Sequence, residues 1–188
     1  MFQFPRWVLR MVKRVDDTGD MGGTAAKTAN AAPLQVVCFR VGAEEYALDI
    51  GAVQEIREMV PITRVPRTPP YITGVFNLRG RIAPVVDLKM RLAFGRSALT
   101  PETRIIVVED DERQVGVIVD EVTETLDIDP EAVETLAGST IGAPGAAGAG
   151  LEYVDGVAKH DDRLVILLNL DGILRGGRSE VGRENREP

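Results

Sequence analysis

The chain has 188 residues, 44% of them hydrophobic and 27% charged, which is enough for one domain or for two small lobes that share a core. Its formal net charge of −7 argues against nucleic acid as a partner, because binding to a phosphate backbone needs a concentrated basic face. One cysteine, one histidine and the lack of an apolar run of about 18 residues argue against a disulfide framework, a zinc site and a transmembrane span.

The N-terminal region, residues 1–33, is predicted to be a flexible basic extension of the domain. Within residues 1–14, Phe4, Val8 and Met11 share helical spacing, and arginine and lysine side chains occupy the opposite side. Such a helix would make weak contact with an anionic membrane, and the alternative is a frayed extension or a start-site artefact. The rest of the region is rich in Asp, Gly, Thr and Ala without apolar periodicity, which is typical of a linker.

The folded domain is expected to span residues 34–175 and to begin with a β-hairpin. Apolar and polar residues alternate over residues 37–41 and again over residues 46–50, on either side of a glycine-containing turn. Alternation with a period of two indicates strands that bury one face, and a turn between two such runs indicates a hairpin.

A short helical turn is predicted between residues 51 and 59, because Val53 and Ile56 are three residues apart. Glu55 would then lie on the polar side of this turn. The proline-rich stretch 61–70 excludes a long helix and is typical of a bend or of the edge of a sheet.

Three more hairpins and a final helical turn are predicted along the rest of the domain. The hairpins cover residues 74–87, 103–119 and 152–168, and the helical turn covers residues 171–175. The charged, glycine-containing tail 176–188 is expected to be disordered.

The domain contains an internal repeat. Five residues recur 82 positions later, namely Tyr71, Gly74, Val75, Arg81 and Leu88 as Tyr153, Gly156, Val157, Arg163 and Leu170. Upstream, residues 37–55 match residues 106–124 at an offset of 69. The difference between the two offsets, 82 and 69 residues, indicates a 13-residue insertion in the second copy, at the Gly/Ala-rich stretch 137–150. The repeat predicts two similar β-subdomains on one core, which suits the presentation of surfaces better than the enclosure of a substrate.

No catalytic or cofactor motif emerges from the chain. His160 lies in a predicted polar turn beside Asp161, and no nucleophile motif accompanies it. Cys38 lies in an apolar run and is predicted to be a buried strand residue, while the glycines of residues 142–150 lack the Lys-Ser/Thr of a phosphate loop. A carboxylate-only calcium or magnesium site stays open, although residues 110–112 lack calcium-loop spacing. Binding is therefore the favoured class of function, and no small-molecule substrate, metal or cofactor is assigned.

Arg79 is the residue that most suggests a binding site. It lies next to Gly80 at a predicted hairpin bend, where its guanidinium has room to reach a carboxylate or to stack on an apolar partner. Glu55 is a plausible neighbour. The alternative is a plain surface salt bridge, worth less than about 1 kcal/mol.

Several motifs, in order, resemble the CheW family of chemotaxis coupling proteins. They are Glu45–Ile50 (EYALDI), Val53–Ile56 (VQEI), Ile62–Pro66 (ITRVP), Gly74–Gly80 (GVFNLRG) and Pro84–Leu88 (PVVDL). Residues 115–122 and 153–170 extend the similarity, which covers about residues 35–175.

The resemblance implies a fold and a role. The fold would be mainly β, with two SH3-like five-stranded β-barrels packed around a shared hydrophobic core and short helical turns. The role would be that of a non-enzymatic cytoplasmic adaptor, recruited to membrane-associated receptor arrays. It would couple the histidine kinase CheA, through the regulatory domain of the kinase, to the cytoplasmic tip of methyl-accepting chemotaxis receptors. By the resemblance, the receptor tip docks in a groove formed here by Ile50, Val53, Glu55, Ile56, Gly74 and Arg79. No kinase-binding residues are assigned.

Other interpretations remain beside this one. An enzyme is among them, although a screen for nucleotide-dependent or metal-dependent activity is expected to be blank. The chain could be a paralogue that serves another kinase pathway, such as pilus motility or development. It could also be a free regulatory domain of the kinase, or a coupling protein fused to a phosphoacceptor, although no ATP-binding motif or receiver-like acidic pocket accompanies the domain.

Overall fold

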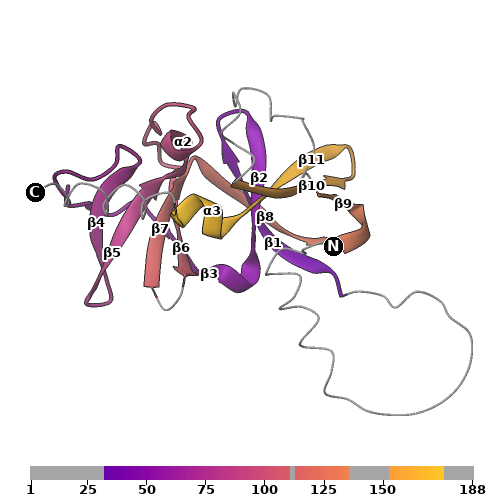
Figure 1. Cartoon of the computed structure of the whole chain (residues 1–188), viewed down its shortest axis with the longest axis horizontal. Helices are drawn as coiled ribbons and strands as arrows, with labels where there is room; N and C mark the ends of the chain where they lie inside the picture. The colour runs from indigo at the N-terminus through magenta and orange to yellow at the C-terminus, as the bar shows by residue number, and fades with distance from the viewer. Residues whose placement is uncertain (1–31, 111–112, 136–152, 176–188) are drawn as a thin grey trace, which may run out of the picture. The chain divides into compact units, whose positions relative to one another are not determined.

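The computed structural model describes residues 32–110, 113–135 and 153–175 of the chain (Figure 1). The expectations for the N-terminal extension, including membrane contact by residues 1–14, lie outside these residues. So do those for the Gly/Ala-rich insertion 137–150 and for the C-terminal tail.

Two β-sheets make up the described part of the domain. The six-stranded sheet runs in the order β8 (Glu121–Ile128), β1 (Leu34–Val41), β2 (Glu44–Asp49), β11 (Arg163–Leu168), β10 (Val154–His160) and β9 (Val133–Glu134). The five-stranded sheet runs in the order β3 (Val53–Glu58), β6 (Arg104–Asp110), β7 (Arg113–Val119), β5 (Arg81–Asp87) and β4 (Ile72–Leu78). The short helical elements are η1 (Ile50–Ala52), α2 (Leu88–Arg91), η2 (Pro130–Ala132) and α3 (Leu170–Arg175). The predicted mainly β fold with short helical turns is confirmed.

All four predicted hairpins are present as antiparallel pairs, β1 with β2, β4 with β5, β6 with β7 and β10 with β11. The helical turn expected at the C-terminal end of the domain is α3. These elements depend on contacts between residues close in sequence, so alternation and turn residues were sufficient to predict them.

The helical turn predicted between residues 51 and 59 is wrong. The chain makes only the short 3-10 turn η1, which Asp49 caps by accepting a hydrogen bond from the Gly51 N–H at 2.7 Å, and then enters strand β3. Residues of β3 bond to β6, a strand about 50 residues further on. This long-range pairing overrides the weak helical spacing of Val53 and Ile56. Strand β8 was not predicted either.

The two copies of the repeat contribute strands to both sheets. The first copy, residues 34–91, places its hairpin β1–β2 beside β8 and β11 of the second copy, residues 104–175. Hairpin β6–β7 of the second copy lies beside β3 and β5 of the first. Figure 1 shows this exchange by colour, because indigo β1 and β2 share a sheet with yellow β10 and β11. Each sheet therefore contains strands from both copies of the repeat, and neither sheet is formed by one copy alone.

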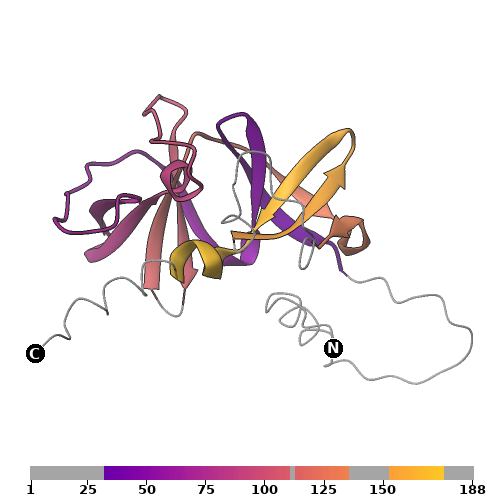
Figure 2. The same cartoon turned by 45° about the horizontal axis from the view of Figure 1, so that its top comes forward.

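A shared hydrophobic core joins the two sheets, which lie side by side in Figures 1 and 2. It combines residues of the six-stranded sheet with residues of the five-stranded sheet, including Phe39, Tyr46, Leu48, Ile106, Val117 and Leu168. Buried apolar contact of this kind is the main favourable term in folding, so the two sheets are expected to unfold together.

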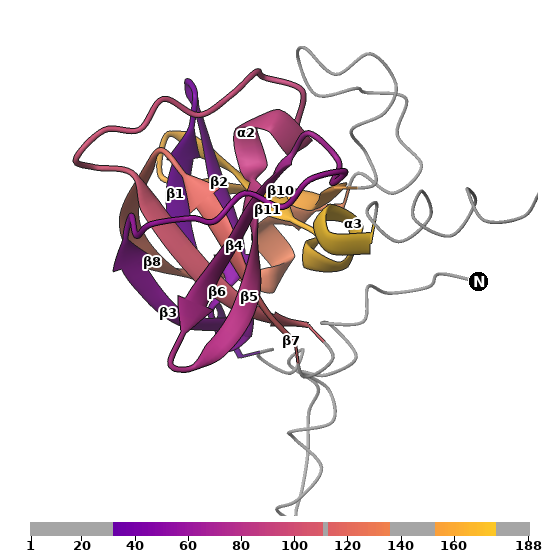
Figure 3. The same cartoon turned by 90° about the vertical axis from the view of Figure 1, so that its left-hand side faces the viewer.

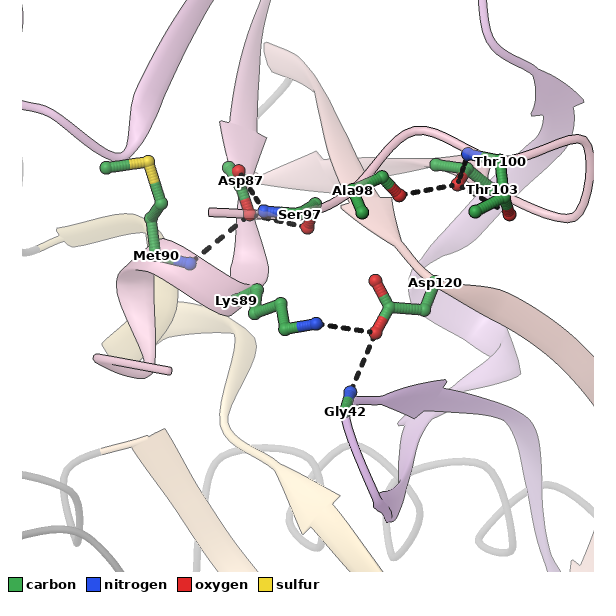
Figure 4. A network of polar contacts seen from close by, with 9 residues as sticks. All are labelled: Gly42, Asp87, Lys89, Met90, Ser97, Ala98, Thr100, Thr103 and Asp120. Carbon is green, nitrogen blue, oxygen red and sulfur yellow. Dashed lines mark hydrogen bonds and ion pairs between the residues drawn. The ribbon is translucent and has the colours of Figure 1, made fainter. Parts of the chain in front are cut away.

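Helix α2 is held by a buried carboxylate at the end of β5 (Figure 4). Asp87 is only 1% exposed and accepts three hydrogen bonds, from the Met90 N–H at 3.2 Å, the Ser97 N–H at 3.0 Å and the Ser97 hydroxyl at 2.8 Å. A buried carboxylate is tolerated when hydrogen bonds of this kind replace its hydration. Asp87 thereby holds the start of α2, through Met90, and the end of the loop that follows this helix, through Ser97.

A second polar contact ties α2 to the other sheet (Figure 4). The Lys89 ammonium lies 3.3 Å from a carboxylate oxygen of Asp120, which follows β7, and the same oxygen accepts the Gly42 N–H at 2.7 Å. The contact connects α2 to the β1–β2 turn. Figure 3, viewed along the long axis of Figure 1, shows α2 and α3 beside the strands.

Replacing Asp87 by alanine is expected to lower the free energy of unfolding by about 2 kcal/mol, because the buried N–H of Ser97 and the half-buried N–H of Met90 would lose their acceptor. Urea denaturation followed by circular dichroism measures this change. Asp162→Ala, in an exposed turn, is the control and should change the stability by less than about 0.5 kcal/mol. Equal stabilities of the two variants would contradict a structural role for Asp87.

Among the residues that the structure describes, no helix is both long and apolar enough to cross a membrane. No group of three or more His, Cys, Asp and Glu side chains in this part of the chain is arranged to hold a metal ion.

Candidate functional site

Strand β3 positions Glu55 at one edge of the five-stranded sheet. A register shift between Val53 and Glu55 brings Glu55 opposite Val107 of β6, and the strand alternates half-buried with exposed side chains. The Glu55 side chain is 24% exposed, so it is held by its surroundings but still reached by water.

The β4–β5 turn brings Arg79 to Glu55. Asn77 accepts the Gly80 N–H at 2.8 Å and closes the turn, while Arg79 adopts a left-handed backbone conformation with φ of 52°. The Arg79 guanidinium donates a hydrogen bond to the Glu55 carboxylate and forms an ion pair with it. The contact expected between these two residues is therefore present.

A second arginine contacts the other carboxylate oxygen of Glu55. Arg57, two residues further along β3, has its Nη1 atom 3.4 Å from Glu55 Oε1, and its guanidinium lies 5.7 Å from the centre of the Phe76 ring. Phe76 belongs to the separate core of the five-stranded sheet. Glu55 is thus held in place by a partner anchored on the core, and Arg79 remains the exposed member of the group.

The Glu55–Arg79 pair contributes little to stability. The Arg79 side chain is 81% exposed, and exposed ion pairs are typically worth less than about 1 kcal/mol because water and salt screen them. An arginine held at a turn yet left accessible is better suited to recognition of a partner than to stabilisation of the fold.

A shallow depression surrounds the pair, with a volume of about 40 Å³. It is lined by Gln54, Glu55, Leu78, Arg79, Val107 and Gln114. Pockets that bury a small molecule measure roughly 300–1,000 Å³, so this surface suits contact with a protein side chain rather than enclosure of a ligand.

The other predicted site residues lie at different depths around β3 and β4. Ile50 in η1 is 38% exposed and Ile56 in β3 is 43% exposed, whereas Val53 packs against the shared core. Strand alternation places Ile56 on the opposite face of β3 from Glu55. Gly74 is buried in β4. The structure therefore brings Glu55 and Arg79 together and leaves Ile56 on the other side of the strand.

Sequence reasoning did not single out Arg57 or Gln114 as part of this surface. Arg57 follows Glu55 by two residues, and reading residues 53–58 as a strand would have placed both on one face. Gln114 approaches only because β7 lies in the same sheet as β3, and that neighbourhood has no local signal in the sequence.

The six-stranded sheet has a group of charged residues at the repeat positions that correspond to Glu55 and Arg79, but the exposed residue at its turn differs. Glu124, the repeat counterpart of Glu55, accepts a hydrogen bond from Arg163 at 2.9 Å, and this bond contributes to the raised pKa of Arg163. The counterpart of Arg79 is Asp161, which has the same φ of 52°. The two turns share a backbone conformation but present opposite charges, so a partner that selects a cation at the turn would distinguish them.

Cys38 is fully buried in β1, as predicted. Desolvation by burial, with a smaller effect of Glu45, raises the pKa of its thiol from 9.0 to about 12. The thiolate is the reactive form of cysteine, so this group is inert near neutral pH. Because the folded-state pKa is raised, the unfolded chain loses its proton first as the pH rises, and the stability that the thiol contributes falls between about pH 9 and 12.

Alkylation of Cys38 by iodoacetamide at pH 8.5 is expected to be about 100-fold slower in the folded protein than in the urea-unfolded chain. Mass spectrometry of timed samples measures both rates. Similar rates in the two states would contradict the burial of this residue.

Comparison with known proteins places these features in a family context. Residues 35–177 match the family model described as "CheW-like domain". The chemotaxis protein CheW of Helicobacter pylori is 36% identical over 151 residues, which cover 78% of this chain and 84% of that protein. Protein FrzA of Myxococcus xanthus is 32% identical over 164 residues, covering 86% and 98%. The crystal structure of the scaffolding protein TtCheW from Thermoanaerobacter tengcongensis superposes with a TM-score of 0.66 and 38% identity, covering 73% of this chain and 90% of that one.

Proposed function

The chain belongs to the CheW-like domain family, as a non-enzymatic scaffold protein of chemotaxis, and we propose that it couples chemoreceptors to a histidine kinase. The receptor partner is the cytoplasmic tip of a methyl-accepting chemotaxis receptor, and the kinase partner is the regulatory domain of CheA. The protein acts in the cytoplasm and is recruited to membrane-associated receptor arrays.

The observation that carries the proposal is the exposed Arg79 held by Glu55 at the edge of the five-stranded sheet. The receptor tip, a helical hairpin, docks against this edge, and apolar contacts supply most of its affinity. Charge complementarity with Glu55 and Arg79 sets the register of the docked helices.

Transmission of the signal rests on the shared core. Because the core joins both sheets, a receptor bound at one sheet and a kinase bound elsewhere are connected through packed side chains that transmit strain. A change in the receptor then shifts the populated states of the kinase through this bridge, provided that the receptor states differ in affinity for the assembly. No residues are assigned to the kinase-binding surface.

Replacing Arg79 by alanine is expected to weaken capture of a receptor cytoplasmic fragment about tenfold, because the exposed cation that faces the partner is removed. A pull-down with the full chain, repeated at several concentrations of the fragment, measures the loss. Arg96→Ala, at another exposed arginine, is the control and should capture as the wild type does. Undiminished capture by the Arg79 variant would remove this residue from the site.

The second candidate is a role in a kinase pathway other than flagellar chemotaxis, such as pilus motility or development. It is favoured by the match to a relative with a different name, protein FrzA, over a larger share of this chain than the Helicobacter pylori protein covers. Affinity capture from the native cell, with identification of the kinase and receptor retained, distinguishes the two pathways.

A further inference from the structure

Arg91 breaks the internal repeat at a structurally important position. Arg91 is the fourth and last residue of α2. The fourth residue of α3, 82 positions later in the chain, is Ile173. Ile173 is 1% exposed and belongs to the shared core. The first copy therefore places a guanidinium where the second copy places a core aliphatic side chain.

The contacts of Arg91 reach both copies of the repeat. Its guanidinium carbon lies 4.5 Å from the centre of the Tyr71 ring and 4.6 Å from the centre of the Tyr153 ring. Arg91 also donates hydrogen bonds to two carbonyl oxygens of α3, from Nε to Ile173 at 3.0 Å and from Nη2 to Gly172 at 3.3 Å. Each tyrosine directly precedes the equivalent hairpin of its own copy, β4–β5 for Tyr71 and β10–β11 for Tyr153.

The two tyrosines are also equivalent in their backbone bonding. The Tyr71 carbonyl accepts the Asp87 N–H at 2.7 Å, and the Tyr153 carbonyl accepts the Asn169 N–H at 2.8 Å. One arginine thus contacts the same position of both copies, and these positions are tied by hydrogen bonds to the last residues before α2 and α3.

We propose that Arg91 is the positioning residue that fixes the orientation of the two sheets relative to each other. Apolar core contacts attract without direction, so they permit small rotations of one sheet against the other. A planar guanidinium with donors in fixed directions, lying over two aromatic rings, restricts those rotations. The inference also rests on the proposed function, because a bridge between receptor and kinase transmits a bias only when its orientation is defined.

The orientation can be measured directly with two spin labels. Ile82 and Leu164 occupy equivalent repeat positions in β5 and β11, one in each sheet, and are 77% and 65% exposed. Both are changed to cysteine in a Cys38→Ala background and labelled, and pulsed electron paramagnetic resonance gives the distribution of distances between the labels. We expect Arg91→Ala to broaden this distribution about twofold, Arg91→Lys to broaden it less because the charge over the rings remains, and the Arg96→Ala control to leave it unchanged.

A distribution in Arg91→Ala that is as narrow as in the wild type would overturn the proposal. Circular dichroism first confirms that each variant folds. If Arg91→Ala does not fold, the distance distribution of Arg91→Lys tests the proposal instead. Lysine keeps the charge but lacks the planar donors, so an unchanged distribution in that variant would also overturn the proposal.

A functional measurement separates this inference from the proposed function. With a receptor fragment and the histidine kinase present, Arg91→Ala should capture the receptor within about twofold of the wild type but lose about fivefold in receptor-dependent kinase stimulation. Undiminished stimulation despite a broadened distribution would overturn the relay role of Arg91. Failure of the wild type to capture any receptor would instead overturn the proposed function, and the distance measurement would still decide the role of Arg91 in orientation.

Discussion

Replacing Gly74 by alanine is expected to lower the free energy of unfolding by about 4 kcal/mol, since backbone strain and overpacking add together. Gly74 has a φ of +152°, where a side chain is strained. A Cβ atom there would collide with the Thr63 carbonyl oxygen and lie 2.8 Å from Ile62 Cγ2. Thr63 cannot move away freely, because it exchanges two backbone hydrogen bonds with Val75, at 2.8 and 2.9 Å.

Urea denaturation of Gly74→Ala measures this effect, with Gly80→Ala as the matched control. Gly80 has a φ of +86° but no atom within 4 Å of the added Cβ, so its replacement should cost only about 1 kcal/mol. Equal losses in the two variants would show that the close approach of Thr63 does not contribute to the loss of stability in Gly74→Ala.

The comparison also bears on the predicted receptor contact of Gly74. A buried glycine affects the site through the position of β4, so any loss of receptor capture should accompany the loss of stability.

Reversing the charge of Glu55 is expected to weaken receptor capture about 100-fold, more than the loss of Arg79 alone. In Glu55→Arg three guanidinium groups, at positions 55, 57 and 79, would be close together, and their repulsion would displace the exposed Arg79 from its place at the turn. Pull-down of the receptor fragment measures capture, and a thermal melt of the same preparation checks that the variant is folded. Glu124→Arg, the same change at the repeat counterpart in the other sheet, should leave capture within about twofold of the wild type.

The exchange variant Glu55→Arg/Arg79→Glu distinguishes recognition from a structural role. It can form the ion pair again, but it presents a carboxylate at the turn instead of a guanidinium. We expect it to recover stability and to capture the receptor no better than Glu55→Arg alone. Capture restored to the wild-type level would mean that the pair matters only for holding the turn.

Local patterns in the sequence were sufficient for the hairpins and the family resemblance. Each hairpin has alternating side chains on both sides of a short turn, and a residue such as Gly80 marks the bend. The contact of Arg79 with Glu55 could also be anticipated, because the turn left the guanidinium room and the motif supplied a carboxylate. In contrast, the helical prediction for residues 51–59 failed because the spacing of two apolar residues is a weak signal over so short a segment.

By itself, the sequence determined that the domain is mainly β, that it repeats one unit and that it presents binding surfaces rather than a catalytic centre. These conclusions depend on alternation, spacing and residue type, which are local properties. Only the tertiary structure decided that the copies exchange strands between the two sheets, and that Arg91 meets the equivalent tyrosines Tyr71 and Tyr153. Strand partners far apart in the chain are chosen by the packing of the whole core, and that choice leaves no pattern in any short segment.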